Sequence, residues 1–293
     1  MPKAKKKALL AIINPISGTT KKEYVPETLD KLIDKNKFDL TVRFTQCQGH
    51  ATTLTQEAIK ENYYGVVAIG GDGTINEVAS ALRDSNTALG IIPCGSGNGL
   101  ARHLGVPVNI EKAIQILNLD NVECLDYCTV NDHPFFCTCG VGFDAHVSEK
   151  FALSHKRGPL SYIQNTLIEY LKYRPQKYHI EMGDETITEE AFLIACGNAS
   201  QYGNNAYIAP QASLTDGLMD VTIMEPFTVL DVPSLSFQLF NKTIDQDSHV
   251  KTLKCNSLHI KRAKNGVAHF DGDPIMLGES IDVKIVKQGL KVI

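Results

Sequence analysis

Apolar positions along the first 120 residues follow two alternating patterns. Short apolar runs, the first of which is KALLAII at 7–13, are typical of strands buried in a parallel sheet. Between the runs, apolar residues recur three or four positions apart, as they do on one face of a helix. Strands are predicted at 7–13, 38–45, 65–69 and 88–92, and helices at about 25–33, 51–61, 98–104 and 110–117, with another after Thr74. Strands that alternate with helices predict an α/β N-terminal domain, with a parallel sheet and helices on both faces.

From about residue 122 the pattern changes to short strand-like runs separated by turns. Two runs at 122–130 and 135–140 flank the turn 131–134 and predict a β-hairpin. Further strands are predicted at 191–196, 219–224, 252–262, 267–270 and 281–286, with helices at about 160–173 and 228–241. We expect a mainly antiparallel, β-rich C-terminal domain. The predicted domains are 1–124 and 125–293, and the final residues are free to pack back on the first domain.

The composition limits the classes of function. The chain has 293 residues, 43% of them apolar, which is enough for one large or two ordinary domains. A net charge of −4 and the lack of a basic stripe interleaved with aromatic residues exclude nucleic acid as the expected partner. No apolar stretch approaches the roughly 18–20 residues that span a bilayer. The cysteines are expected to be reduced thiols in the cytoplasm, and zinc binding at 124–139 is disfavoured because no CxxC pair occurs there.

The strongest candidate for chemistry is Gly70-Gly71-Asp72-Gly73-Thr74, which joins a predicted strand to a predicted helix. Glycines let the backbone approach a phosphate closely, and the start of the next helix presents free N–H groups to the anion. No GK[ST] follows, and Asn76 stands where a dinucleotide fingerprint has its third glycine. The loop is therefore neither a P-loop nor a Rossmann fingerprint, and alone it is also compatible with an ordinary glycine turn.

Two further loops of similar design make a nucleotide site the better interpretation. Cys94-Gly95-Ser96-Gly97-Asn98-Gly99 follows the strand 88–92 and precedes a predicted helix. Asn14-Pro15-Ile16-Ser17-Gly18 follows the first strand. In a parallel sheet all three loops lie at the carboxyl ends of strands, along the edge where ligands bind.

Six motifs together resemble the diacylglycerol kinase catalytic family, which includes bacterial soluble lipid kinases and the sphingosine and ceramide kinases. They are NPISG at 14–18, TQCQGHA at 45–51, GGDGTINEV at 70–78, PCGSGNGLARHL at 93–104, SLTDGLMDV at 213–221 and HFDGDP at 269–274. The motifs follow the family's order through most of the chain, although GGDG alone also occurs in NAD kinases and phosphofructokinases. The resemblance implies an active site in the cleft between an α/β nucleotide domain and a β-rich domain.

The resemblance also implies an ATP site with Mg2+ as the accompanying metal. The family's ATP contacts correspond to Asn14, Thr45, Gly71, Asp72, Gly73, Thr74 and Ser96. Neighbouring residues of the same loops complete the predicted ATP site: Gly70, Asn76, Glu77, Gly95, Gly97 and Asn98. Asp72 would in addition act in catalysis by organising metal or phosphate.

The late motifs imply the remaining roles. The family's DGE motif supplies the general base, and it corresponds to Asp271-Gly272-Asp273, so Asp271 is the implied base. A turn carboxylate of a hairpin is the alternative interpretation of this Asp-Gly pair. The structural magnesium site would use the Asp216 carboxylate with main-chain oxygens of Ser213 and Leu218.

Two departures from the family pattern leave the substrate open. Gly99 stands where many bacterial members carry aspartate, and Asp273 stands where DGE has glutamate. We expect an ATP-dependent lipid kinase that transfers the γ-phosphate to a diacylglycerol-like or sphingoid hydroxyl, in phospholipid biosynthesis. Its expected partner is a lipid at the membrane surface, through transient peripheral contact, and a homodimer is left open. The alternatives are a soluble-substrate kinase of the NAD kinase type, which does not predict GSGNGLA or the late DGD, and a nucleotide-binding regulator without catalysis, which explains both departures.

Overall fold

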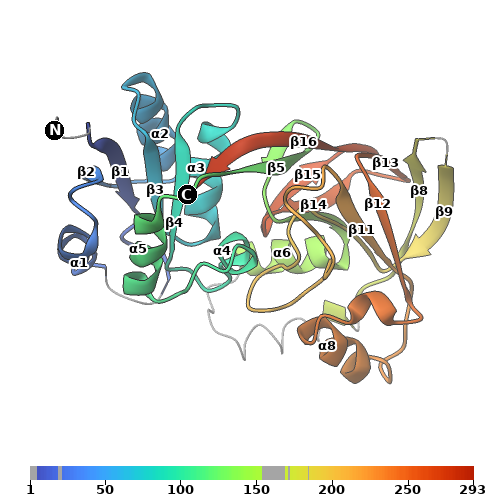
Figure 1. The fold of residues 1–293 in the computed structure, drawn as a ribbon. Helices are drawn as coiled ribbons and strands as arrows, with labels where there is room; N and C mark the ends of the chain where they lie inside the picture. The colour runs from blue at the N-terminus through green and yellow to red at the C-terminus, as the bar shows by residue number, and fades with distance from the viewer. Residues whose placement is uncertain (1–4, 19–21, 154–168, 171, 184) are drawn as a thin grey trace. The chain divides into compact units, whose positions relative to one another are not determined.

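The chain folds into two compact units, which we describe separately. A computed structural model describes residues 5–18, 22–153, 169–170, 172–183 and 185–293 (Figure 1). The first unit comprises Met1–Tyr127 with Lys287–Ile293, and the second comprises Cys128–Val286. The last seven residues of the chain thus belong to the first unit.

The first unit is built on a parallel sheet with the strand order β2-β1-β3-β4. Its strands are β1 (Lys7–Ile13), β2 (Phe38–Phe44), β3 (Gly65–Gly70) and β4 (Ala88–Pro93). Every residue of β3 and β4 is buried, which explains why the two strands are continuous apolar runs. The end of β16 (Ser280–Val292) adds to β4 in parallel, where Val292 lies opposite Leu89.

In the described part of the first unit, five helices follow these strands. They are α1 (Val25–Leu32), α2 (His50–Lys60), α3 (Asp72–Leu82), α4 (Gly99–His103) and α5 (Ile110–Leu119). Four of these helices pack in two pairs, α1 with α5 and α2 with α3, which cover the two faces of the sheet (Figure 1). The predicted α/β domain with a parallel sheet and helices on both faces is confirmed.

The second unit contains a six-stranded antiparallel sheet in the order β12-β11-β10-β7-β14-β15. Its strands are β7 (Thr138–Gly142), β10 (Leu193–Gly197), β11 (Met219–Met224), β12 (Val250–Cys255), β14 (Gly266–Phe270) and β15 (Asp273–Leu277). A second antiparallel ladder joins β16, β13 (Ser257–Arg262), β8 (Gln176–Met182) and β9 (Glu185–Ala191), and β5 (Glu123–Val130) pairs with β6 (His133–Phe135).

One hydrophobic core joins the two ladders of the second unit. Val141, Ile194 and Val221 enter this core from the six-stranded sheet, and Ile180 and Ile260 enter it from the other ladder. The described helices of the unit include α6 (Phe143–Leu153), α8 (Val232–Phe240) and a short 3-10 helix at Ile244–Gln246. The predicted antiparallel, β-rich C-terminal domain is therefore confirmed.

The predicted hairpin at 122–140 is wrong in its second strand. β6 ends at Phe135 and pairs with β5, whereas β7 begins at Thr138 and belongs to the six-stranded sheet. The chain changes sheets at 136–137, where the N–H groups donate to the carboxylate of Asp271 instead of to a neighbouring strand. The predicted strand 252–262 likewise splits at Asn256 into β12 and β13, which lie in different sheets.

Among the described residues of the second unit, β8, β9, β15, α6 and the short 3-10 helix were not predicted. β8 and β9 have few apolar residues, and α6 buries Phe143, Ala145 and Val147, an alternation that imitates a strand. The predicted helix 228–241 is found as α8. Most of the predicted helix 160–173 lies outside the described residues.

Candidate active site

The loop after β1 is tied to the glycine loop after β3. The Asn14 side chain donates from Nδ2 to Thr74 Oγ1 at 3.0 Å, and the Asn14 backbone N–H donates to the Ile69 carbonyl at 3.0 Å. Asn14 Oδ1 in turn accepts the N–H of Ile16 at 3.1 Å, which shapes the loop that follows. Two residues predicted to contact ATP, 60 positions apart, are thus brought together.

The three predicted loops converge through their glycines. A Cβ on Gly95 would lie 2.5 Å from the Cα of Gly71, and a Cβ on Gly18 would overlap the Cys94 carbonyl oxygen. Gly18 also has φ +68°, a left-handed conformation that favours glycine. The Cys94 N–H donates to the Gly70 carbonyl at 2.7 Å. These close approaches account for glycine at 18, 71 and 95, and they confirm that the loops meet at one edge of the sheet.

Asp72 joins the glycine loop to the loop after β4. Its Oδ2 accepts the N–H of Asn98 at 2.8 Å, and its Oδ1 accepts the N–H of Gly99 at 2.7 Å, so the carboxylate caps the start of α4. Burial raises the pKa of the Asp72 carboxyl above its ordinary value, although these two bonds and the nearby Arg102 guanidinium act to lower it. Asp72 therefore holds the loops after β3 and β4 together, and its role in organising metal or phosphate stays a prediction.

Asn98 fixes the shape of the loop after β4. Its Oδ1 accepts the N–H of Gly95 at 2.9 Å, and its Nδ2 donates to the Gly95 carbonyl at 2.8 Å. Asn98 is buried with φ +55°, and Arg102 Nε donates to the Gly97 carbonyl at 3.1 Å. Because Asn98 is turned inward, Ser96 is the exposed side chain of the loop.

The start of α3 is the open part of the site. Gly71 precedes the helix in an extended conformation (φ −92°, ψ −173°) and has no side-chain cap. A Cβ on Gly70 would lie 2.5 Å from Thr74 Oγ1, so packing requires this glycine. Gly73 differs, because it is exposed and a Cβ there would meet no atom within 4 Å. The first N–H groups of a helix lack partners within the helix. This end of α3 therefore offers N–H groups next to open space.

Glu77 and Asn76 are used inside the unit. Glu77 accepts the N–H of Gly49 at 2.9 Å and that of Ala51 at 3.1 Å, so its carboxylate caps α2. Asn76 Oδ1 accepts the Ser80 hydroxyl at 3.2 Å, one turn further along α3. These two members of the predicted ATP site thus have structural partners, and their direct contact with ATP stays a prediction.

Sequence reasoning missed a buried lysine beside the loops. Lys22 is 3% exposed, and its ammonium donates to the carbonyl and the hydroxyl of Ser17. Burial lowers the pKa of this amine below its ordinary value, against the influence of the nearby Cys94 thiol. A lysine four residues after NPISG was the available signal, and its place beside Ser17 adds a positive charge to the loop cluster.

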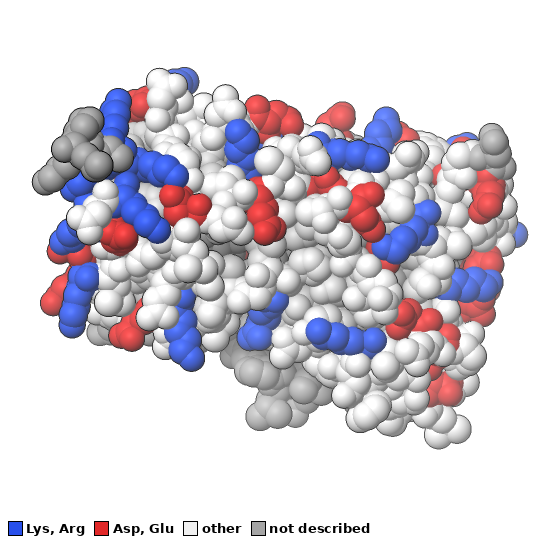
Figure 2. Space-filling model, in the orientation of Figure 1, with Lys and Arg blue, Asp and Glu red and all other residues white. Residues whose placement is uncertain are grey.

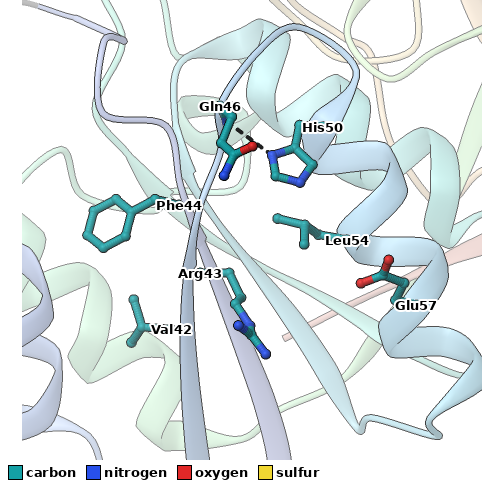
Figure 3. A pocket seen from close by; sticks show the side chains of 7 residues that line it. All are labelled: Val42, Arg43, Phe44, Gln46, His50, Leu54 and Glu57. Atoms are coloured by element: carbon teal, nitrogen blue, oxygen red, sulfur yellow. Dashed lines mark hydrogen bonds between the residues drawn. The ribbon is translucent and has the colours of Figure 1, made fainter.

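A hollow lies between β2 and α2, next to Thr45 in the sequence. It has a volume of about 520 Å³ and is lined by Val42, Arg43, Phe44, Gln46, His50, Leu54 and Glu57 (Figure 3). The Gln46 backbone N–H donates to His50 Nδ1 at 3.0 Å, which orients the ring. Thr45 does not line the hollow, and its backbone N–H donates to the Ile13 carbonyl at 2.9 Å. We assign no ligand to this hollow.

Asp271 lies in the two-residue turn of the β14–β15 hairpin, in the second unit. Its φ of +48° and that of Gly272, +90°, are the left-handed values of a tight hairpin turn. Oδ1 accepts the N–H groups of Cys137 at 2.7 Å and Thr138 at 3.2 Å, and Oδ2 accepts that of Phe136 at 2.9 Å. The carboxylate is thus fixed by the backbone where the chain changes sheets, and its role as a base stays a prediction.

A buried network that the sequence did not reveal surrounds His269. His269 Nε2 lies 3.0 Å from Asp144 Oδ2, which also accepts the Tyr202 hydroxyl at 3.0 Å. His269 is 1% exposed, and its Nδ1 has no hydrogen-bond partner within the described part of the chain. Asp144 and His269 are 125 positions apart, so no local spacing could have indicated the pair.

A lysine occupies the predicted magnesium site. Lys254 Nζ lies 3.1 Å from Asp216 Oδ2, 2.9 Å from Asp220 Oδ2 and 3.3 Å from the Gln211 carbonyl oxygen. Burial lowers the pKa of Lys254, but hydrogen bonds with Asp220 and Asp216 outweigh that effect and hold its pKa above the ordinary value.

The other predicted magnesium ligands, Ser213 and Leu218, lie in the same loop as Asp216. Asp216 Oδ1 accepts the Leu218 N–H at 3.0 Å, and the hydroxyls of Ser213 and Thr215 lie 3.4 Å apart. Among the described residues no group of three His, Cys, Asp or Glu side chains could hold a metal. Magnesium prefers about six oxygen ligands, whereas here an ammonium already faces the carboxylate. These residues do not fit a magnesium ion as they stand.

Comparisons with known proteins identify the family. The model of the diacylglycerol kinase catalytic domain matches residues 8–130, and the model of the YegS C-terminal NAD kinase beta sandwich-like domain matches residues 137–293. A protein of Serratia proteamaculans, named a probable lipid kinase, YegS-like, is 30% identical over 92% of this chain and 88% of its own length. The chain therefore belongs to the diacylglycerol kinase catalytic family of lipid kinases, which confirms the resemblance of the motifs.

Two further relatives extend the comparison. An uncharacterised protein of Synechocystis sp. is 29% identical over 95% of this chain, and the chain spans 64% of the length of that relative. The crystal structure of a diacylglycerol kinase from Bacillus anthracis str. Sterne has a TM-score of 0.76 and covers 98% of this chain and 96% of its own, at 21% identity. The structural likeness supports the two-unit fold. Among the described residues, no helix has the length and apolar character needed to cross a membrane.

Proposed function

We propose that the protein is an ATP-dependent lipid kinase that transfers the γ-phosphate of ATP to a hydroxyl of a diacylglycerol-like or sphingoid lipid. The observation that carries this proposal is the convergence of the loops after β1, β3 and β4 around the open start of α3. Family membership supplies the reaction class, and the relatives named as lipid kinases favour a lipid acceptor.

The first unit would hold the nucleotide, taken as MgATP. Backbone N–H groups at the start of α3 would bind phosphate oxygens over Gly73, where the structure leaves room. The exposed Ser96 would add a hydroxyl, and Lys22 would add positive charge beside Ser17. Phosphoryl transfer depends mostly on positioning and on neutralising charge, which these groups supply. A metal at Asp216 has no part in this proposal, because the Lys254 ammonium lies 3.1 Å from that carboxylate.

The second unit would supply the general base. Asp271 would accept the proton of the lipid hydroxyl as its oxygen attacks the γ-phosphate. The three N–H groups that bind its carboxylate would hold it in one position during the reaction. The same bonds support a purely structural role, so the base assignment depends on a measurement of turnover.

The alternatives differ in their products. A kinase of the NAD kinase type would phosphorylate a soluble dinucleotide, and a regulator without catalysis would bind ATP unchanged. We would incubate the protein with γ-labelled ATP and a panel of diacylglycerol, ceramide, sphingosine, phosphatidylglycerol and NAD. Label in the organic phase supports the lipid kinase. Label in NADP, or no transfer to any acceptor, overturns it.

A further inference from the structure

Exposed apolar side chains gather on one segment of the second unit. Four large hydrophobic residues lie within twelve positions of one another: Val229 is 53% exposed, Leu230 89%, Phe237 67% and Phe240 55%. The other exposed large hydrophobic residues of the described chain are scattered between positions 16 and 276. Single exposed apolar residues are ordinary, but a cluster of this kind marks a binding surface. We call these four residues the α8 patch.

The geometry of α8 explains why the patch is exposed. Leu235 is 5% exposed and packs into a core cluster with Ile244 and Val250, and Leu239 packs against the same cluster. At about 100° per residue along α8, Phe237 lies on the side of the helix opposite Leu235 and Leu239, and the exposed Leu230 precedes the helix. One face of α8 is therefore anchored in the protein, and the face with Phe237 and Phe240 is turned outward.

The area of the patch argues against a stable protein partner. A fully buried phenylalanine covers roughly 150–250 Å², so four side chains at these exposures offer on the order of 400 Å². A specific protein interface buries about 800 Å² on each partner. A second copy of this chain would need a larger surface than the patch provides, whereas a few inserted side chains are enough for reversible binding to a lipid surface.

Charged side chains lie at the borders of the patch, with Glu225 before it and Lys242, Asp245 and Asp247 after it. The segment 226–241 carries one acidic residue, Asp231, whose Oδ2 accepts the N–H and the hydroxyl of Thr228. The exposed Lys242 lies two positions after the end of α8, with its ammonium 4.5 Å from the centroid of the Tyr207 ring. The surface over α8 is largely uncharged (Figure 2). An apolar face bordered by a lysine and a tyrosine is typical of a helix that enters the interfacial region of a membrane.

We propose that the α8 patch docks the protein on a lipid bilayer, with Phe237 and Phe240 inserted among the acyl chains and Lys242 near the lipid phosphates. The proposal rests on the proposed lipid kinase function, because a kinase of this kind must meet its acceptor at the membrane. The partner is the bilayer surface itself, independent of which lipid is phosphorylated.

Vesicle co-sedimentation tests the docking surface without any catalysis. Wild-type protein, the double variant Phe237→Ser/Phe240→Ser and the control Leu119→Ser would be mixed with vesicles of phosphatidylcholine and phosphatidylglycerol. Leu119 is 68% exposed at the end of α5, so it matches the exposure of Phe237 outside the patch. We expect the double variant to lose about tenfold in vesicle partitioning for each phenylalanine and the control to bind like wild type.

Several outcomes would overturn the docking proposal. These are a wild-type protein that stays in the supernatant, a double variant that pellets within twofold of wild type, and a patch-dependent dimer in gel filtration. If the double variant is unfolded by circular dichroism, Leu230→Ser, at the most exposed position, replaces it. If vesicle binding depends on the α8 patch but no lipid is phosphorylated, the proposed function is wrong and the docking surface is still supported.

Discussion

The variant Gly73→Ala should raise the stability of the fold and weaken the binding of ATP. The added Cβ would meet no atom within 4 Å, and Gly73 does not have a left-handed backbone. Glycine in a helix costs up to about 1 kcal/mol relative to alanine, so the variant should gain roughly 0.5–1 kcal/mol in the free energy of unfolding. This gain corresponds to about 1–3 °C in Tm for a chain of this size.

In the proposed nucleotide site, the same methyl group would stand where the phosphates of ATP are expected to approach the backbone. We expect the Kd for ATP to rise at least about tenfold, which corresponds to about 1.4 kcal/mol. Thermal unfolding followed by fluorescence gives the Tm, and isothermal titration calorimetry gives the Kd. An alanine at 73 that stabilises the protein but weakens ATP binding would show that glycine is kept there for the ligand.

Two further glycines complete the comparison. Gly278→Ala places a Cβ 4.0 Å from the nearest atom in the second unit, and it should leave the Kd unchanged. Gly95→Ala places a Cβ 2.5 Å from the Cα of Gly71, and it should lower the free energy of unfolding by about 1–3 kcal/mol. If Gly73→Ala binds ATP within twofold of wild type, the phosphates do not lie over this loop and the reasoning is refuted.

Three other properties follow from the site and its surroundings. Asp271→Asn should lower turnover by about 10²–10⁴-fold, whereas the control Asp273→Asn, one position past the turn, should keep turnover within a few-fold of wild type. A folded Asp271→Asn protein with near-normal turnover would show that Asp271 is not the general base. Lys254→Met should lower the Tm, because the carboxylates of Asp216 and Asp220 lose their counter-ion. EDTA should leave the Tm of the wild-type protein unchanged, and a Tm that falls with EDTA would show that a metal binds at Asp216. Burial raises the pKa of Asp120, but hydrogen bonds from Lys7 and Tyr64 outweigh burial and hold that pKa below its ordinary value. The Asp120 carboxylate therefore stabilises the fold above about pH 4, and this stability is lost as the pH falls through the lowered pKa. Circular dichroism against pH should show a shallower acid transition for Asp120→Asn, and an unchanged profile would contradict the pairing.

The first unit could be predicted from sequence because its signals are local. The run 7–13 coincides with β1, and the three loops converge because parallel strands end at one edge of the sheet. The roles of Asp72 and Glu77 as helix caps could not be predicted. Their partners lie 26 to 28 positions away on other loops, and carboxylates near phosphate-binding glycines have several uses.

The second unit was harder to predict because distant contacts decide its strands. The break between β6 and β7 depends on Asp271, more than 130 positions further along the chain. α6 was missed because its buried residues, Phe143, Ala145 and Val147, alternate with half-buried ones, as residues of a strand do. The ammonium of Lys254 at Asp216 likewise joins residues 38 positions apart, and nothing in SLTDGLMDV indicates it.

Mass spectrometry of a lipid extract tests the central claim most directly. The protein would be incubated with ATP and a total lipid extract in vesicles, with Asp271→Asn protein as the matched control. The account predicts that one class of hydroxyl-bearing lipid gains a single phosphate group, only when wild-type protein and ATP are both present. An extract in which no lipid gains a phosphate, although the protein is folded and binds ATP, would contradict a lipid kinase.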